Sequence, residues 1–169
     1  IFWDNAYGMH HLYDHHQDHL IEILAECKRA GNPDLVYKFA STSKITFPGA
    51  GMSVMASSVE NIKYMTKLIS VQTISYDKVN QLRHVMYLKN REHTLALMKK
   101  HGKIMAPKFE MVLKMLREQL TNKGIAHWHH PNGGYFVCVA AMPGTAKRTL
   151  ELCKQAGVVM TEAGATYPY

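Results

Sequence analysis

Short apolar segments alternate with helical segments along the first half of this chain of 169 residues. Three segments, Ile1–Trp3, Leu35–Ala40 and Met52–Ala56, have the length and composition of buried strands. Apolar residues at helical spacing predict a helix over His16–Ala30, and a second helix is expected from Ser57 or Ser58 to about Ile69. This order predicts an α/β fold with a parallel or mixed sheet covered by helices, and ligands are expected beyond the carboxyl ends of its strands.

The second half of the sequence changes from long helices to a small mixed domain. Two connecting helices are predicted, from Asp77 to about Lys100 and over Ala106–Asn122. Beyond Gly124 the predicted elements are short: strands over Ile125–His129, Tyr135–Val139 and Val158–Met160, and a helix over Thr145–Ala156 closed by Gly157. We therefore expect three parts: residues 1–88 in a large sheet domain, 89–122 in connecting helices, and 123–169 in an incomplete small α+β C-terminal domain.

The composition argues against several classes of protein. The formal net charge is +7, but lysine and arginine are spread through helical segments, so no nucleic-acid partner is expected. The longest apolar run, Tyr135–Met142, is far too short to span a membrane, and no signal peptide is visible. Cys27, Cys138 and Cys153 show no CxxC spacing, which favours reduced thiols in a cytoplasmic protein.

One lysine, Lys44, lies in the unusual sequence STSKITFPGAG, between small hydroxyl residues and a glycine-rich turn. A lysine that loses its proton in a pocket can form a Schiff base, and pyridoxal phosphate is a cofactor held in this way. The cofactor also needs a carboxylate for its ring nitrogen, a donor for its ring oxygen and hydroxyls for its phosphate. Asp4, Tyr7, Ser41 and Ser43 offer these groups after predicted strands, although each alone also suits an ordinary turn, core or capping role.

Asp-x-x-Tyr after a strand, followed later by Ser-x-Ser-Lys, resembles the core of the fold-type I pyridoxal-phosphate aminotransferases. The strings WDNAYGMHHL, FASTSKITFPGAG, DKVNQLRH, GGYFV, MPGTAKR and AGATYPY look like the bacterial aspartate aminotransferase-like branch of the class I/II superfamily, in order and spacing. The resemblance runs nearly from end to end. It implies the three-layer pyridoxal-phosphate transferase fold, with the C-terminal part of the large sheet domain followed by the small α+β domain.

The resemblance also implies a role for each candidate residue. Lys44 would form the internal aldimine and then move the α-proton of the substrate, and Asp4 would pair with the pyridinium nitrogen. Tyr7 would hydrogen-bond the ring 3-oxygen, and Ser41 and Ser43 would lie near the phosphate. The implied reaction moves an amino group between an amino acid, aspartate, and a 2-oxo acid, 2-oxoglutarate.

This sequence departs from the family pattern in three places. Many relatives carry an arginine for the phosphate where this chain has Met52, so another cation or the loop amides around Gly49 and Gly51 must take its place. The upstream segment that supplies a helix N-terminus for the phosphate has no counterpart, and neither does the C-terminal arginine that binds the substrate carboxylate. The chain is therefore expected to be a central-to-C-terminal fragment that is inactive by itself.

Two other functions stay open at this point. Some transcription regulators carry an aminotransferase-like domain that senses the cofactor, and the same fold supports other pyridoxal-phosphate reactions such as β-elimination. The resemblance further implies a homodimer, with the segment Thr73–His84 near the interface that completes each active site.

A histidine-rich segment, HHLYDHHQDH, follows the first candidate residues. Within a helix, His11, His15 and His19 would share one face, and this spacing can bind a metal. No further ligand is apparent in the sequence, so a solvated helix start is favoured and no physiological metal is expected. His10, next to the candidate cofactor residues, is the histidine best placed for a function.

Overall fold

The structure is a computed structural model that describes residues 1–162, 164 and 165. It divides into two compact units. Unit 1 comprises Ile1–Ala106 together with Asn132–Tyr135, and unit 2 comprises Pro107–Pro131 and the described residues from Phe136 onward. Most of the string AGATYPY, quoted above, lies outside the described residues. The division at residues 88 and 122 stays a prediction.

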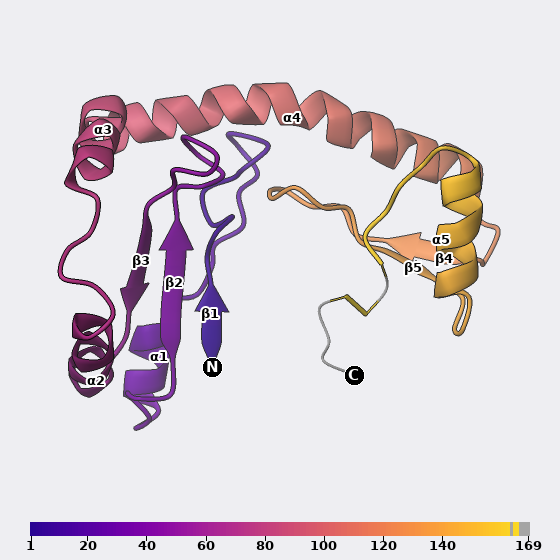
Figure 1. Ribbon diagram of the computed structural model, residues 1–169. Helices are drawn as coiled ribbons and strands as arrows, with labels where there is room; N and C mark the ends of the chain where they lie inside the picture. Colours follow the sequence, from indigo (N-terminus) through magenta and orange to yellow (C-terminus); the bar gives the residue numbers. More distant parts are fainter. Residues whose placement is uncertain (163, 166–169) are drawn as a thin grey trace. The chain divides into compact units, whose positions relative to one another are not determined.

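The sheet of unit 1 has three strands in the order β1-β2-β3 (Figure 1). β1 (Phe2–Asp4) pairs in parallel with β2 (Tyr37–Ser41), and β2 pairs antiparallel with β3 (Ser53–Ala56). The three predicted strands and the mixed sheet are confirmed. Because β1 and β2 are parallel, with Asp4 opposite Phe39, the loops that follow them start at the same edge.

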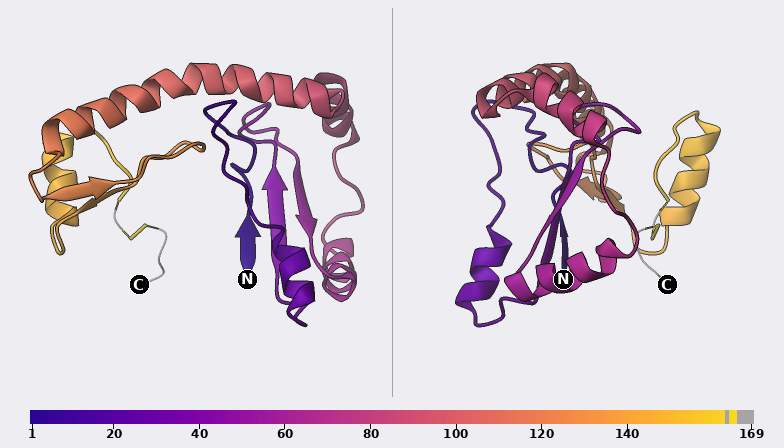
Figure 2. Two further views of the ribbon diagram at one scale, coloured as in Figure 1. Left: turned by 180° about the vertical axis from the view of Figure 1, so that it is seen from behind. Right: turned by 60° about the vertical axis from the view of Figure 1, so that its left-hand side comes forward.

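Four helices accompany this sheet: α1 (Ile23–Arg29), α2 (Val59–Ser70), α3 (Lys78–Leu88) and the first part of α4 (Arg91–Leu120). Ser58 caps α2, since its hydroxyl accepts the Asn61 N–H at 3.2 Å, and Asp77 caps α3 in the same way. α3 and the start of α4 lie beyond the carboxyl ends of β1 and β2, and α1 and α2 lie nearer the opposite end (Figures 1 and 2).

The helix predicted from His16 is shorter than expected. It begins at Ile23, where the side chain of Glu22 accepts the Leu24 N–H at 3.3 Å. The preceding residues are not helical, and Leu20 and Ile21 are more than half exposed. Apolar spacing through Leu20 therefore extended the prediction too far, because that side chain has no core to enter.

The predicted break near Gly102 is also in the wrong place. α4 continues from Arg91 through Pro107 to Leu120, and the break lies at Lys89, whose φ is 59°. Asn90 then starts α4, because its side chain accepts the His93 N–H at 2.8 Å. At Gly102 a Cβ atom would lie 2.8 Å from the His11 carbonyl oxygen, so this glycine lets the loop approach the helix.

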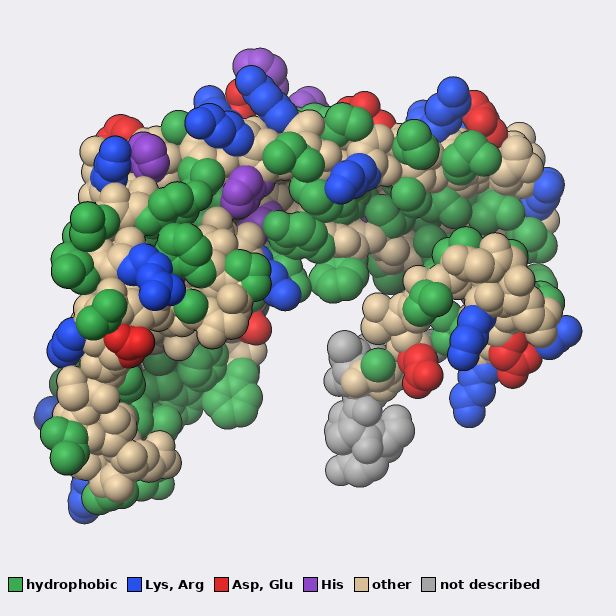
Figure 3. All heavy atoms as spheres, turned by 45° about the horizontal axis from the view of Figure 1, so that its top comes forward, with side chains coloured by type: hydrophobic (Ala, Val, Ile, Leu, Met, Phe, Trp, Pro, Cys, Tyr) green, Lys and Arg blue, Asp and Glu red, His purple; other side chains and the backbone are tan. Residues whose placement is uncertain are grey.

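The core of unit 1 is small. Five hydrophobic residues in the described part of this unit are buried: Leu12, Cys27, Val36, Met98 and Ala106. Two histidines, His10 and His84, are buried with them. Many large hydrophobic side chains of α2 and α3 are exposed, and green hydrophobic spheres are spread over the face seen in Figure 3. No described helix has the length and apolarity needed to cross a bilayer.

Unit 2 pairs β4 (Ala126–Trp128) antiparallel with β5 (Val139–Ala141), and α5 (Ala146–Gln155) follows. Phe109 and Leu113 of α4 are its buried hydrophobic residues among those described. Gly157, with φ of 84°, ends α5 as predicted. The strand predicted over Tyr135–Val139 is displaced to β5, and Val158–Met160 is not a strand, because that apolar run stays exposed.

Candidate functional site

The carboxyl edge of the sheet brings together two loops that the sequence singled out. The first follows β1, and the Asn5 N–H donates to the Phe39 carbonyl oxygen at 2.8 Å. The second, residues 42–52, follows β2 and is called the lysine loop. The His10 ring Nε2 lies 3.1 Å from the Lys44 carbonyl oxygen. A carbonyl only accepts, so Nε2 donates, and this bond ties the first loop to the peptide of Lys44.

The lysine loop makes a tight turn at Lys44. The amides of Ile45 and Thr46 both donate to the Thr42 carbonyl oxygen, at 2.8 and 2.9 Å. The Ser41 and Ser43 hydroxyl oxygens lie 2.7 Å apart, and the Ser43 N–H donates to the Ser41 hydroxyl at 3.1 Å. Lys44 is exposed at this turn. Its ammonium group therefore extends from a backbone that is itself fixed.

The far end of the lysine loop closes back onto its start. The Thr42 N–H donates to the Met52 carbonyl oxygen, and the Met52 N–H donates to the Thr42 hydroxyl, both at 2.8 Å. A Cβ atom at Gly51 would lie 2.9 Å from the Ser43 Cα, so only glycine allows this approach. Gly49 has φ of 77°, a conformation that glycine adopts without strain.

Asp4 and Tyr7 occupy the neighbouring loop. Asp4 is exposed at the end of β1, and its Oδ1 accepts the Ala6 N–H at 2.9 Å. The ring of Tyr7 contacts the rings of Tyr135 and His10, with centroids 5.4 and 5.7 Å apart. The carboxylate is therefore accessible at the sheet edge, while the tyrosine belongs to an aromatic cluster.

Sequence reasoning did not identify Tyr135 as part of this cluster. The His10 and Tyr135 ring centroids are 5.1 Å apart. The pKa of Tyr135 is raised above its ordinary value, mainly because the hydroxyl is partly buried and to a smaller extent because Tyr7 lies nearby. The Gly134 N–H donates to the His10 carbonyl oxygen at 2.8 Å, and a Cβ at Gly133 would lie 2.6 Å from that oxygen. The two glycines were the signal that a backbone approaches closely here.

Several side chains of α3 contact the lysine loop. His84 lies within hydrogen-bond distance of the Thr42 and Thr46 hydroxyls, at 3.0 and 2.8 Å. Asn80 donates to the Ala50 carbonyl oxygen at 2.9 Å. From the sequence, the segment Thr73–His84 was expected only near a dimer interface, and that expectation stays a prediction. The Arg83 guanidinium, a cation in the same helix, lies 5.5 Å from the Phe47 ring centroid.

The histidine-rich segment has no helical face. His11 forms an isolated bridge with Gly133, and His15 and His19 lie in exposed non-helical chain. The predicted helical spacing of these histidines is therefore wrong, because α1 starts only at Ile23. Among the described residues, no group of three or more histidine, cysteine, aspartate or glutamate side chains is arranged to hold a metal ion.

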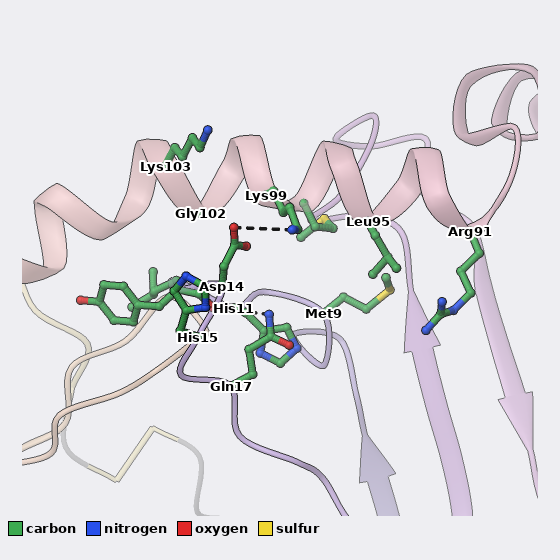
Figure 4. A pocket seen from close by; sticks show the side chains of 13 residues that line it. Met9, His11, Asp14, His15, Gln17, Arg91, Leu95, Lys99, Gly102 and Lys103 are labelled. Carbon is green, nitrogen blue, oxygen red and sulfur yellow. Dashed lines mark hydrogen bonds and ion pairs between the residues drawn. The ribbon is translucent and has the colours of Figure 1, made fainter.

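A pocket of about 620 Å³ lies between this segment and the start of α4 (Figure 4). Its lining includes Arg91, Leu95 and Met98 of the helix, and Asp14 pairs with Lys99 across it at 3.5 Å. Lys44, Asp4 and Tyr7 are not among its lining residues. The pocket is therefore separate from the edge where the candidate cofactor residues lie.

The sequence matches one protein family over its whole length. The family model described as aspartate amino-transferase covers residues 1–169. A putative aminotransferase from Mycolicibacterium smegmatis is 44% identical over 169 residues, which are 100% of this chain and 39% of that protein. An aspartate aminotransferase from Corynebacterium glutamicum is 44% identical over 168 residues, 99% of this chain and 39% of that protein.

Solved structures agree with these matches. A crystal structure of an aspartate transaminase from Corynebacterium glutamicum superposes with a TM-score of 0.90 at 44% identity, covering 99% of this chain and 39% of that one. An α-aminoadipate aminotransferase from Thermus thermophilus, solved with N-(5'-phosphopyridoxyl)-L-leucine, has a TM-score of 0.70 at 19% identity, over 94% of this chain and 39% of that one. The α/β fold is thus that of the pyridoxal-phosphate aminotransferases, and the chain spans about two-fifths of the length of its curated relatives.

Proposed function

We propose, since this chain belongs to the aspartate aminotransferase family, that the full-length protein is a pyridoxal-phosphate-dependent aminotransferase that uses Lys44. We further propose aspartate as the amino donor and 2-oxoglutarate as the acceptor. One curated relative with 44% identity is named an aspartate aminotransferase, which supports this choice. The observation that carries the proposal is the exposed Lys44 in a fixed turn at the sheet edge, beside the loop of Asp4 and Tyr7.

The residues present fit the cofactor. Ser41 and Ser43 place two hydroxyls 2.7 Å apart, and Gly51 leaves no room for a side chain where it meets Ser43. Hydroxyls and amides of such a turn suit a phosphate, and they can serve where Met52 replaces the family's arginine. Asp4 supplies the carboxylate that a protonated pyridine nitrogen requires. When bound, pyridoxal phosphate supplies an electron sink for the negative charge that develops on the substrate's α-carbon.

Each residue then has a defined task. The Lys44 amine would hold the cofactor by a covalent bond and later carry the proton removed from the substrate's α-carbon. The Asp4 carboxylate would keep a proton on the ring nitrogen, and the Tyr7 hydroxyl would donate to the ring oxygen. The bond from His10 to the Lys44 carbonyl would keep the lysine backbone still while its side chain moves.

We also propose how the full-length protein is organised. The relatives are more than twice as long as this chain, so residues 1–169 by themselves are expected to be inactive. The complete protein is expected to be a homodimer. Cys27, Cys138 and Cys153 are free thiols in the structure, which suits a protein that works in the reducing cytoplasm.

Replacing Lys44 tests the function directly. In the full-length protein, Lys44→Ala should abolish the visible absorbance of covalently held cofactor and stop amino transfer from aspartate to 2-oxoglutarate. Lys63→Ala is the matched control, because Lys63 forms an exposed ion pair with Glu60 that contributes little to stability. Undiminished transfer by Lys44→Ala would overturn the proposal. Transfer that requires a different amino donor would overturn only the choice of aspartate.

A further inference from the structure

His84 is the buried residue of α3 that contacts the lysine loop most closely. It is 5% exposed. Its Nδ1 lies 2.9 Å from the Asn80 carbonyl oxygen of the preceding helical turn. Its Nε2 faces the hydroxyls of Thr42 and Thr46, one on each side of Lys44 in sequence. Both ring nitrogens are therefore engaged, one with the helix and one with the loop.

The partners of His84 define the direction of these bonds. A carbonyl oxygen only accepts, so Nδ1 carries a proton and donates to Asn80. Nε2 of the neutral ring is then an acceptor. The Thr42 hydroxyl already accepts the Met52 N–H, which leaves its own hydrogen free to donate to Nε2. The Thr46 hydroxyl also lies close to Nε2, but its hydrogen is donated to the Thr42 carbonyl oxygen at 3.1 Å, so Thr42 is the donor to Nε2. One imidazole thus connects α3 to the start of the lysine loop and contacts Thr46 within it.

Other contacts from α3 fix the rest of the loop. Asn80 donates to the Ala50 carbonyl oxygen at 2.9 Å, one helical turn before His84. The Phe47 ring packs edge-on against the His84 imidazole, with centroids 5.5 Å apart, and lies 5.1 Å from the Tyr87 ring. The turn that carries Lys44 is therefore held at Thr42, Thr46, Phe47 and Ala50 by a single helix.

We propose that His84 is a positioning residue for Lys44. This inference rests on the proposed function, in which Lys44 is the reacting amine. A buried position next to Phe47 could be filled by an apolar ring, but only a ring with two hydrogen-bonding nitrogens can bond to the Thr42 hydroxyl and to the helix at the same time. Hydrogen bonds at both nitrogens of a buried ring favour one geometry of the loop. Transfer of a proton by Lys44 depends on that geometry, because small displacements of a reacting group are costly.

Two substitutions at His84 in the full-length protein separate positioning from packing. His84→Phe keeps the ring and removes both hydrogen bonds, whereas His84→Gln keeps a polar group that can reach the threonine hydroxyls. We expect His84→Phe to lower kcat and the rate of covalent cofactor attachment about 10- to 100-fold, with KM nearly unchanged. His84→Gln should recover most of this loss. Amide hydrogen exchange of the cofactor-free protein should rise at residues 42–52 in His84→Phe and not elsewhere.

Two further variants control for folding and for local packing. Tyr87→Phe keeps the ring against Phe47 and should leave every readout unchanged. Thr42→Val removes the loop partner of His84, and also the hydroxyl that accepts the Met52 N–H, without touching α3. Its effect should be at least as large as that of His84→Phe, and it can be measured even if His84→Phe does not fold. Normal attachment and kcat in Thr42→Val would overturn the inference, and so would exchange that rises evenly along the chain in His84→Phe. Attachment of the cofactor to another lysine in the unsubstituted protein would overturn the proposed function as well.

Discussion

At the scale of residues, the lysine that we propose as the reactive group and the histidines that contact its loop differ in exposure. Lys44 is exposed, whereas His10 and His84, which hold the backbone around it, are buried. His10 donates to the Lys44 carbonyl oxygen, and His84 accepts from the Thr42 hydroxyl and contacts the Thr46 hydroxyl. An amine that must bond a cofactor and then move a proton needs a mobile side chain on a fixed backbone. This arrangement provides both.

Asp4 gives a prediction at the same scale. Asp4→Ala in the full-length protein should still attach the cofactor at Lys44, because the carboxylate takes no part in that bond. Amino transfer should slow by a factor of about 10²–10³, since the electron sink loses the charge that keeps its nitrogen protonated. Stopped-flow absorbance measures the step, and Asp34→Ala, a change in a turn before β2, serves as the control. A variant with normal turnover would assign the role to another group.

The sequence predicted that the loops of the candidate site meet at one edge, but not which residues support them. Lys44, Asp4, Ser41 and Ser43 carry recognisable chemical groups at the ends of strands, and the sheet indeed brings their loops to one edge. The role of His84 was not predictable, because its partners lie 38 and 42 residues away and no local pattern encodes that contact. The roles of Lys44, Asp4, Ser41 and Ser43 toward the cofactor stay predictions.

At the scale of elements, the strands of unit 1 were predicted more accurately than the helix ends. These strands are short apolar runs, so their positions follow from composition. Helix ends depend on individual caps and contacts. The side chain of Glu22 caps the start of α1, and the side chain of Asn90 caps the start of α4. Gly102 lies inside the continuous helix α4 because a larger residue there would collide with the His11 carbonyl oxygen. None of these contacts follows from apolar spacing.

Gly51 tests how tightly the lysine loop is closed. In Gly51→Ala the new Cβ would lie 2.9 Å from the Ser43 Cα, so the backbone must shift. We expect a loss of about 1–3 kcal/mol in the free energy of unfolding, together with slower cofactor attachment. Gly49→Ala is the control, because its φ of 77° causes strain but its Cβ meets no atom within 4 Å. Gly49→Ala should lose stability and keep the cofactor attachment rate of the unsubstituted protein. Equal attachment rates in Gly49→Ala and Gly51→Ala would contradict a specific role of the Gly51–Ser43 contact.

At the scale of the whole molecule, the exposed apolar surface is the main feature. α2 and α3 carry large hydrophobic side chains that no described residue covers, among them Val59, Tyr64, Val79 and Val85. Such surfaces mark interfaces with other segments or subunits. The chain spans about two-fifths of the length of its curated relatives, so further segments of a full-length protein could cover part of this surface, and we propose that a second subunit covers another part.

We expect the full-length protein to be a two-fold symmetric dimer with a large interface. Val79→Asp on α3 should weaken the dimer at least about tenfold, because a charge would replace an apolar contact. Light scattering over a dilution series measures this, with Val159→Asp in unit 2 as the control. A stable and active monomer at low concentration would contradict the dimer.

Chemical trapping shows directly which lysine bonds the cofactor. Borohydride reduction of the full-length protein with bound pyridoxal phosphate makes the lysine linkage permanent, and peptide mapping then locates the label. We expect a single labelled peptide that contains Lys44, with no label in Lys44→Ala. A label on any other lysine of the unsubstituted protein would contradict it.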